Sequence, residues 1–232
     1  MWLLAGAGAS AVLAIVVIAL VVPRGAPPTA LDRWVFDTTS GWTAQAPWAK
    51  QAAAVIGAAT DVVPSSLLAV AVTIALLVAR RAAFALFVAG SAAVGALVAE
   101  VLKLSIGRQR PPGAAQYVQD LDRSFPSGHA SAGIYLYAAL AVLLILVARR
   151  RGSRPLLWSG RALFVCGAAL GLTRIVLGVH WATDVMAGWA NTSVVLLLAA
   201  YFVRPDDAAL GAGPPGGPPT DAALPADAGT EP

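Results

Sequence analysis

Long apolar runs, separated by short charged or polar stretches, form the main pattern along this chain of 232 residues. A helix needs about 20 apolar residues to cross the hydrocarbon core of a bilayer. Runs of about that length predict six spans, at residues 3–22, about 52–79, 82–102, 129–148, about 163–176 and 181–203. Because helices satisfy their own backbone hydrogen bonds within lipid, the expected fold is all-α, an integral-membrane bundle of six transmembrane helices.

Two segments of this pattern are less regular. Residues 23–50 contain prolines and three tryptophans, and indole rings favour the headgroup zone, so we expect an interfacial segment there. Asp61 and Pro64 interrupt the apolar run that begins at residue 52, which leaves the start of the second span open. An ionisable group inside a span is a functional hypothesis, but we favour Asp61 as the interfacial start of the helix.

The two ends of the chain carry their own predictions. The first apolar run lacks a charged start and is long for a signal peptide, so a retained helix is favoured over cleavage. Residues 205–232 are rich in Pro, Gly, Ala and Asp and are expected to form a disordered cytoplasmic tail. The membrane domain is therefore expected to comprise residues 1–204.

Composition excludes an ordinary soluble protein. Hydrophobic residues make up 58% of the chain and charged residues 12%, against roughly 25% charged in a typical globular domain. The net charge is +4, but the arginines lie in short clusters between apolar runs, which favours a role in membrane orientation over nucleic-acid binding. The single cysteine excludes an intrachain disulfide and a thiolate metal site.

Most of the candidate chemistry lies in three short stretches, which the predicted topology places on one face of the membrane. They are KLSIGRQRP at residues 103–111, PSGH at 126–129 and TRIVLGVHWATD at 173–184. The chain has only two histidines, His129 and His180, and both lie in these stretches.

Together the stretches resemble the signature of the type-2 phosphatidic acid phosphatase family, which includes membrane lipid-phosphate phosphatases and, more distantly, soluble vanadium haloperoxidases. The resemblance covers about residues 60–200, with Thr173 where the signature commonly has serine. It implies a lipid-phosphate phosphatase, and the predicted spans argue against a haloperoxidase. The residues at its functional positions are Lys103, Arg110, Ser127, Gly128, His129, Arg174, His180 and Asp184.

Five of these residues are suited to bind phosphate. A phosphate ester carries negative charge on its nonbridging oxygens, and the transition state needs those oxygens held and neutralised. Lys103, Arg110 and Arg174 supply three cations, and arginine offers paired donors that match phosphate oxygens. Ser127 and Gly128 lie where the fourth span begins, and free backbone N–H groups at a helix start bind anions.

The remaining three divide the catalytic work. His180 and Asp184 are four residues apart and share a helix face, so Asp184 can fix the ring tautomer and leave the other nitrogen free to attack phosphorus. His129 is the candidate general acid that protonates the leaving alkoxide, after which water hydrolyses the phosphohistidine. The resemblance implies the same roles. No metal and no cofactor are expected, because the acidic residues are too scattered for a carboxylate cage.

Other residues near these stretches receive structural roles. Arg108 and Arg123 fall outside the signature and are expected to contact lipid headgroups. Glu100 lies three residues before Lys103 and is expected to pair with it. Trp181 is a candidate for the entrance of the site.

The distribution of basic residues predicts the orientation. Each side of the bundle holds eight of the sixteen lysines and arginines. Setting aside Lys103, Arg110 and Arg174 as site residues leaves eight against five. The side with Arg80, Arg81, Arg204 and the arginines of residues 149–161 should therefore be cytoplasmic, with both termini, and the site should be extracytoplasmic.

Several functional questions stay open from the sequence. Candidate substrates are undecaprenyl diphosphate, phosphatidate and phosphatidylglycerol phosphate, and an outward-facing site favours recycling of a carrier lipid in a bacterial cell membrane. A phosphotransferase would use the same residues with an acceptor other than water. An anion transporter could also line its path with cations, but it would not need the Asp184 partner of His180. The expected partners are the lipid phosphate and membrane lipids, with no nucleic acid, and the oligomeric state is open.

Overall fold

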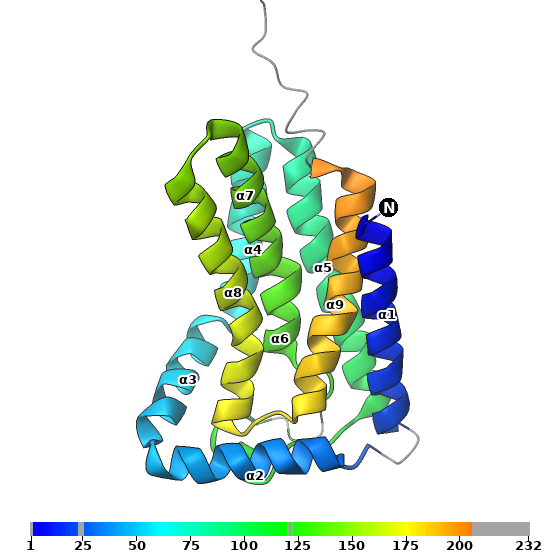
Figure 1. The fold of residues 1–232 in the computed structure, drawn as a ribbon, viewed down its shortest axis with the longest axis vertical. Helices are drawn as coiled ribbons and strands as arrows, with labels where there is room; N and C mark the ends of the chain where they lie inside the picture. Colours follow the sequence, from blue (N-terminus) through cyan, green and yellow to red (C-terminus); the bar gives the residue numbers. More distant parts are fainter. Residues whose placement is uncertain (1, 23–25, 120, 122, 206–232) are drawn as a thin grey trace, which may run out of the picture.

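A computed structural model describes residues 2–22, 26–119, 121 and 123–205, and every regular element in these ranges is helical (Figure 1). A π-helical segment, Gly133–Ala138, joins α6 to α7 without a break. The predicted tail lies outside the described residues from 206 onward. The α-helices, in chain order, are α1 (Trp2–Val21), α2 (Ala30–Gln45), α3 (Pro47–Ala59), α4 (Val62–Val78), α5 (Ala82–Ile106), α6 (Gly128–Ala132), α7 (Ala139–Arg151), α8 (Arg154–Leu177) and α9 (Ala182–Val203).

Six segments of the described chain can serve as membrane spans. Five are long and apolar enough individually, namely α1, α5, the continuous segment Gly128–Arg151, α8 and α9. The sixth is the pair of α3 and α4, which is bent by 45° between Ala59 and Val62. The prediction of an all-α bundle with six candidate spans is therefore confirmed.

Two span boundaries are explained by helix caps. Asp61 accepts a hydrogen bond from Val62 N at 2.8 Å, so α4 begins there, and Pro64 lies in its first turn, where the missing N–H has no helical partner to lose. The prediction that α8 begins near residue 163 is wrong. Ser153 caps the helix and Pro155 lies in its first turn, so α8 begins at Arg154 and includes a polar turn that an apolar window omits.

α2 lies across one end of the bundle rather than along it (Figure 1). Thr29 and Asp32 form a reciprocal capping box at its start. Trp34 is 66% exposed and Trp42 48%, while Asp32 is fully buried. The tryptophan side chains of α2 therefore face outward, while its buried acid, Asp32, points into the protein. This is the arrangement expected of a segment that lies at the membrane interface.

Small residues allow the central helices to approach closely. A methyl group at Gly133 would collide with the carbonyl oxygen of Gly167 in α8. At Gly188 of α9 it would lie 2.8 Å from the carbonyl oxygen of Ser127. Close backbone approach is the usual way in which helices pack within lipid. These contacts fix both ends of α6, at Ser127 and Gly133, against α9 and α8.

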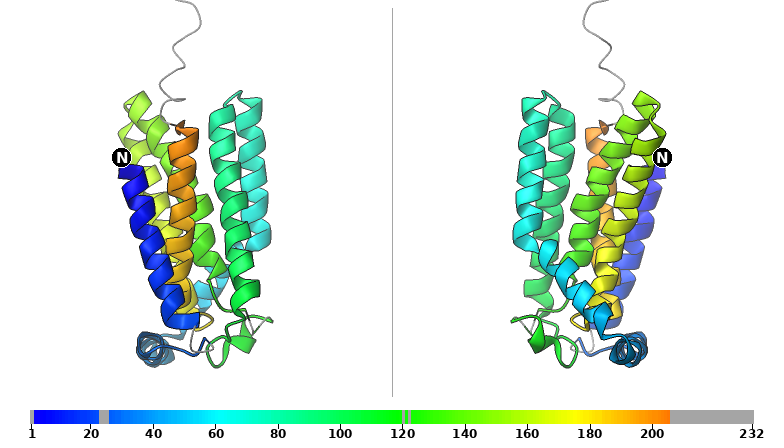
Figure 2. Two further views of the ribbon diagram at one scale, coloured as in Figure 1. Left: turned by 90° about the vertical axis from the view of Figure 1, so that its right-hand side faces the viewer. Right: turned by 90° about the vertical axis from the view of Figure 1, so that its left-hand side faces the viewer.

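The bundle has two different ends. One end carries α2, the loop of residues 107–127 and the short α8–α9 connection, as Figures 1 and 2 show. The opposite end carries the α4–α5 and α7–α8 turns, together with the start of α1 and the end of α9. Arg80, Arg81 and the arginines of residues 149–154 are therefore far from the first end, where all three sequence stretches meet.

Candidate active site

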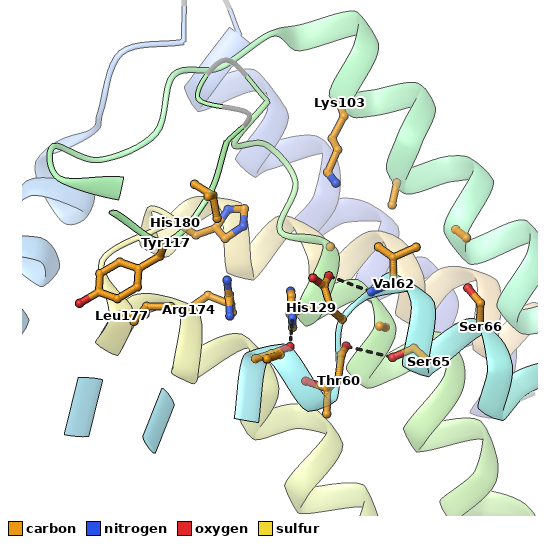
Figure 3. A pocket seen from close by; sticks show the side chains of 18 of the residues that line it. Thr60, Val62, Ser65, Ser66, Lys103, Tyr117, His129, Arg174, Leu177 and His180 are labelled. Atoms are coloured by element: carbon orange, nitrogen blue, oxygen red, sulfur yellow. Dashed lines mark hydrogen bonds between the residues drawn. The ribbon is translucent and has the colours of Figure 1, made fainter. Parts of the chain in front are cut away.

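A pocket of about 490 Å³ lies at the α2 end of the bundle, between α3, α4, α5, α6 and α8 (Figure 3). The side chains of Lys103, His129, Arg174 and His180 converge on it in that view. Ser127 and Asp184, both fully buried, are not part of its lining. The structure thus brings six of the eight predicted residues to one cavity, namely Lys103, Arg110, Gly128, His129, Arg174 and His180.

Three cations line this pocket from three different segments. Lys103 comes from the last turn of α5, and its Nζ would lie 3.4 Å from a methyl group at Gly128. Arg110 follows the left-handed Gly107 that ends α5, and its Nη1 donates to Val179 O at 2.9 Å. Arg174 comes from the last turn of α8. The segments are held together by the fold, so the positive charge is in place before any anion binds.

Arg174 has an unused donor. Its side chain is 6% exposed, and its buried Nε has no hydrogen-bond partner among the described residues. A buried polar group without a partner costs free energy, and native structures rarely keep one without a reason. An anion in the pocket would supply the missing acceptor.

Gly57 of α3 makes room for this guanidinium. A methyl group on Gly57 would overlap Arg174 Nη1. We expect Gly57→Ala to displace the guanidinium and to lower the rate of phosphate release by about ten- to a hundredfold, the value of one to two charge-assisted hydrogen bonds. Because alanine favours helices, the thermal stability should not fall. Initial rates and thermal unfolding in detergent check both expectations.

The matched control is Gly90→Ala in α5, where an added methyl group meets nothing within 4 Å. That variant should keep the wild-type rate. A Gly57→Ala variant as active as Gly90→Ala would show that the position of Arg174 does not limit the rate.

His180 lies in the short loop between α8 and α9 and is 5% exposed. Its Nε2 lies 2.9 Å from Arg110 Nη1. Since arginine can only donate, Nε2 must accept, and the ring proton must be on Nδ1. Nδ1 faces Asp184 Oδ2 and Ser124 Oγ, each at 3.5 Å. The ring is therefore held as the tautomer whose Nε2 lone pair is directed toward the lining of the pocket.

The surroundings keep this ring neutral. Burial first, and then the positive charges of Arg110 and Arg174, lower the pKa of His180 to about 3, against the opposing hydrogen bond to Asp184. An imidazole is a nucleophile only in its neutral form. At neutral pH His180 therefore carries the lone pair that an attack on phosphorus requires.

His129 lies in the first turn of α6, and its ring is beside the guanidinium of Arg174 in Figure 3. Its Nε2 is 3.0 Å from Gly57 O, so this nitrogen carries the proton and donates to the carbonyl. Gly57 thus contacts both His129 and Arg174. The ring itself lines the pocket and can exchange a proton with a group bound there.

The serine of the PSGH stretch has a local role. Ser127 Oγ accepts from Ala130 N at 3.4 Å and caps α6, while Ser127 N donates to Asp184 O at 3.0 Å. Its hydroxyl does not line the pocket, whereas Gly128 does. Thr173, which stands where the family signature commonly has serine, donates to Leu170 O of its own helix. This difference from the signature therefore does not alter the lining of the pocket.

Two buried residues outside the predicted site, Ser124 and Arg108, contact the carboxylate of Asp184, and a third, Asp32, pairs with Arg108. Ser124 Oγ donates to Asp184 Oδ2 at 2.5 Å. Arg108 forms ion pairs with both Asp184 and Asp32. Headgroup contact, the role expected for Arg108, is wrong, because its side chain has no exposed surface. No spacing rule could find Asp32, which is 152 residues before Asp184 in the chain.

Two further predictions concern residues near the site, Glu100 and Trp181, and only the one for Glu100 is confirmed. Glu100 pairs with Lys103 at 3.9 Å, as expected, and also with Arg123 at 3.9 Å. Trp181 does not line the entrance. It is 7% exposed, and its Nε1 donates to Gln109 O at 2.9 Å, so it secures the arginine-containing loop instead.

Comparisons with known proteins lead to one family. The model of the PAP2 superfamily matches residues 84–207. Lipid A 1-phosphatase of Rhizobium johnstonii is 34% identical over 118 residues, which are 47% of this chain and 43% of that protein. Phosphatidylglycerophosphatase B of Bacillus subtilis is 31% identical over 111 residues, which are 46% of this chain and 51% of that protein. The chain spans about half the length of the curated relatives it matches.

The fold is also shared with a solved structure. The crystal structure of a transmembrane PAP2-type phosphatidylglycerolphosphate phosphatase from B. subtilis superposes with a TM-score of 0.68 and 21% identity. The match covers 85% of this chain and 95% of the other. The matched family residues include all three sequence stretches and every residue predicted for the site. This chain is a helical membrane protein that belongs to the PAP2 superfamily, and the relatives that it matches are lipid phosphatases.

Proposed function

We propose that the protein is an integral-membrane lipid phosphatase that removes phosphate from a lipid phosphomonoester or diphosphate through a phosphohistidine. The observation that carries the proposal is the state of His180, a neutral ring that lines the pocket together with Lys103, Arg110 and Arg174 and whose Nε2 accepts a hydrogen bond from Arg110. A nucleophile beside three cations suits an anionic electrophile such as a phosphate ester.

The proposed reaction has two halves. In the first, His180 Nε2 attacks phosphorus, a P–N bond forms, the P–O bond to the lipid breaks, and His129 protonates the leaving oxygen. In the second, His129 takes a proton from water, whose oxygen displaces Nε2 and releases inorganic phosphate. Asp184 stabilises the positive charge that His180 acquires between the two steps.

The proposal needs no metal ion. The three cations can neutralise the nonbridging oxygens, which is the task a metal performs in other phosphoryl transfers. Among the described residues, no group of three or more histidine, cysteine, aspartate or glutamate side chains could hold a metal ion.

An apolar groove next to the pocket supports a lipid substrate. A second cavity of about 390 Å³ lies mainly between α4 and α5 and is lined mostly by apolar side chains, among them Ala69, Ala89 and Ala93. It shares four lining residues with the phosphate pocket, namely Ser65, Ser66, Ala96 and Tyr135. An ester bound by its phosphate in the first cavity can place an apolar chain in the second.

The identity of the substrate and the membrane face that carries the site are also proposed. The relatives are named for lipid A 1-phosphate and phosphatidylglycerophosphate, which share a phosphomonoester at the membrane surface. Phosphatidate presents the same group to the pocket, whereas undecaprenyl diphosphate presents the terminal phosphoryl group of a diphosphate. The arginine-rich turns lie at the opposite end of the bundle, and this distribution supports an extracytoplasmic site.

The test is a direct comparison of substrates. The protein in detergent, with EDTA present, is given undecaprenyl diphosphate, phosphatidate and a water-soluble phosphate ester, and released phosphate is measured. The proposal expects release from at least one lipid, faster than from the soluble ester at equal concentration. Release that requires an added acceptor would indicate phosphotransfer, and no release from any of the three would contradict the proposal.

A further inference from the structure

A chain of buried charges connects α2 to the proposed nucleophile. Asp32, Arg108 and Asp184 are 0%, 1% and 0% exposed. Arg108 Nη2 donates to Asp32 Oδ2 at 2.7 Å, and Arg108 Nη1 donates to Asp184 Oδ1 at 2.5 Å. The three residues come from an interfacial helix, the loop after α5 and the first turn of α9.

Every donor of the Arg108 guanidinium has an acceptor. Nε donates to Ala26 O at 3.1 Å, and Nη2 makes a second bond to Pro27 O at 3.2 Å. Nη1 makes its second bond to Thr183 Oγ1 at 2.7 Å. Five N–H groups with five acceptors leave Arg108 no donor for a ligand, so its function lies within the protein.

Asp32 is equally saturated. Its two oxygens accept from the backbone N of Thr183 and of Thr29, each at 2.9 Å, and from Arg108. Burial alone would raise the pKa of Asp32, but the donors from Thr183, Thr29 and Arg108 hold it below the ordinary value. Asp32 is therefore ionised and fixes both Arg108 and the start of α9.

The network divides the two carboxylate oxygens of Asp184 between Arg108 on one side and the residues around His180 on the other. Arg108 holds Oδ1, whereas Oδ2 accepts from Ser124 Oγ, from Trp181 N at 2.8 Å and faces His180 Nδ1. Without Arg108 the carboxylate could rotate, and the His180 ring would lose its fixed partner. Burial of charges is costly and a hydrophobic substitute would often be more stable, so a purely structural role does not account for the network.

We propose that Asp32 and Arg108 are positioning residues that act through Asp184 to hold the His180 ring with Nε2 toward the pocket. α2 is then a part of the catalytic apparatus, although none of its residues lines the pocket. The inference rests on the proposed function of His180 as the nucleophile.

The experiment compares Asp32→Asn and Arg108→Lys with Asp37→Asn, which changes an exposed acid on the same helix. Asparagine removes the charge of Asp32 at nearly constant volume. Lysine keeps the charge of Arg108 but lacks the planar guanidinium with its paired donors. For both test variants we expect kcat to fall at least tenfold with KM within twofold of wild type. Asp37→Asn should match wild type in both constants.

A second measurement does not depend on activity. The chain has two histidines, so uniform ¹⁵N-histidine labelling of protein purified without a histidine tag gives ring signals from His129 and His180 alone. We expect the His180 signals to move in the two test variants, the His129 signals to stay, and neither to move in Asp37→Asn.

The outcomes separate the two proposals. Unchanged kcat in the test variants, a change confined to KM, or unmoved His180 signals would overturn the positioning role. Wild-type protein that releases no phosphate would contradict the phosphatase proposal, while the ring signals would still test the network. If Asp32→Asn yields no folded protein, Arg108→Lys and Thr183→Val decide the question by the same criteria, because Thr183→Val removes a link without removing a charge.

Discussion

Replacing His180 with alanine is expected to lower phosphate release by roughly four to six orders of magnitude, the loss seen when a nucleophile is removed from an otherwise intact active site. The structure gives the reason, since His180 Nε2 is the one imidazole nitrogen in the pocket held as an acceptor among the described residues. The three cations would still bind phosphate, so the substrate should still bind. Rates with the lipid that the wild type hydrolyses fastest provide the measurement.

The intermediate can be tested in the same preparation. A substrate labelled with ³²P in the transferred group should label wild-type protein during turnover, and the label should be released in acid and retained in base, as a phosphohistidine behaves. His180→Ala should take up no label, and Asp37→Asn should label as the wild type does. Retention of more than about a hundredth of the wild-type rate in His180→Ala would contradict nucleophilic catalysis by this residue.

The second large effect is expected at His129 and should depend on the leaving group. Replacement by asparagine should lower the rate with a lipid phosphomonoester by roughly a hundred- to ten-thousandfold, the usual contribution of a general acid. An alkoxide leaving group needs that proton, whereas a nitrophenolate does not. With p-nitrophenyl phosphate the first half of the reaction should therefore proceed, and the phosphoenzyme should accumulate because no base activates water.

A burst of nitrophenol equal to the amount of enzyme, followed by slow turnover, would be the signature of His129→Asn. Gly90→Ala, with its added methyl group in open space, provides the control for handling in detergent. An equal loss with both esters would contradict the assignment of His129 as the acid. It would indicate that the hydrogen bond from His129 to Gly57 O mainly holds α3 in place.

The sequence predicted the parts of this protein that depend on short-range patterns. Apolar runs locate the spans because the bilayer demands a minimum length, and α5 and α9 end within a few residues of the expected positions. The predicted contact between His180 and Asp184 is present at 3.5 Å, but the shared helix face is wrong, because His180 lies in the loop before α9, which begins at Ala182. Their catalytic roles stay predictions, because the structure places the groups but does not measure the reaction.

Other features could not be read from such patterns. Arg108 and Arg110 are neighbours in one stretch, yet one is fully buried and the other lines the pocket. Their difference is set by Gly107, whose left-handed conformation ends α5 and turns the next residue inward, and by an acid on α2. Burial of an arginine depends on partners that the fold brings from elsewhere, and a single sequence does not contain that information.

The groove between α4 and α5 affects which concentration sets the rate at which substrate reaches the site. Its lining includes exposed side chains such as Val70, Ile74 and Ala93, on helices that span the bilayer. A lipid that enters there approaches by diffusion within one leaflet and does not have to leave it. The collision frequency is then set by mole fraction in a two-dimensional fluid, so dilution with inert lipid slows the enzyme while dilution with buffer does not.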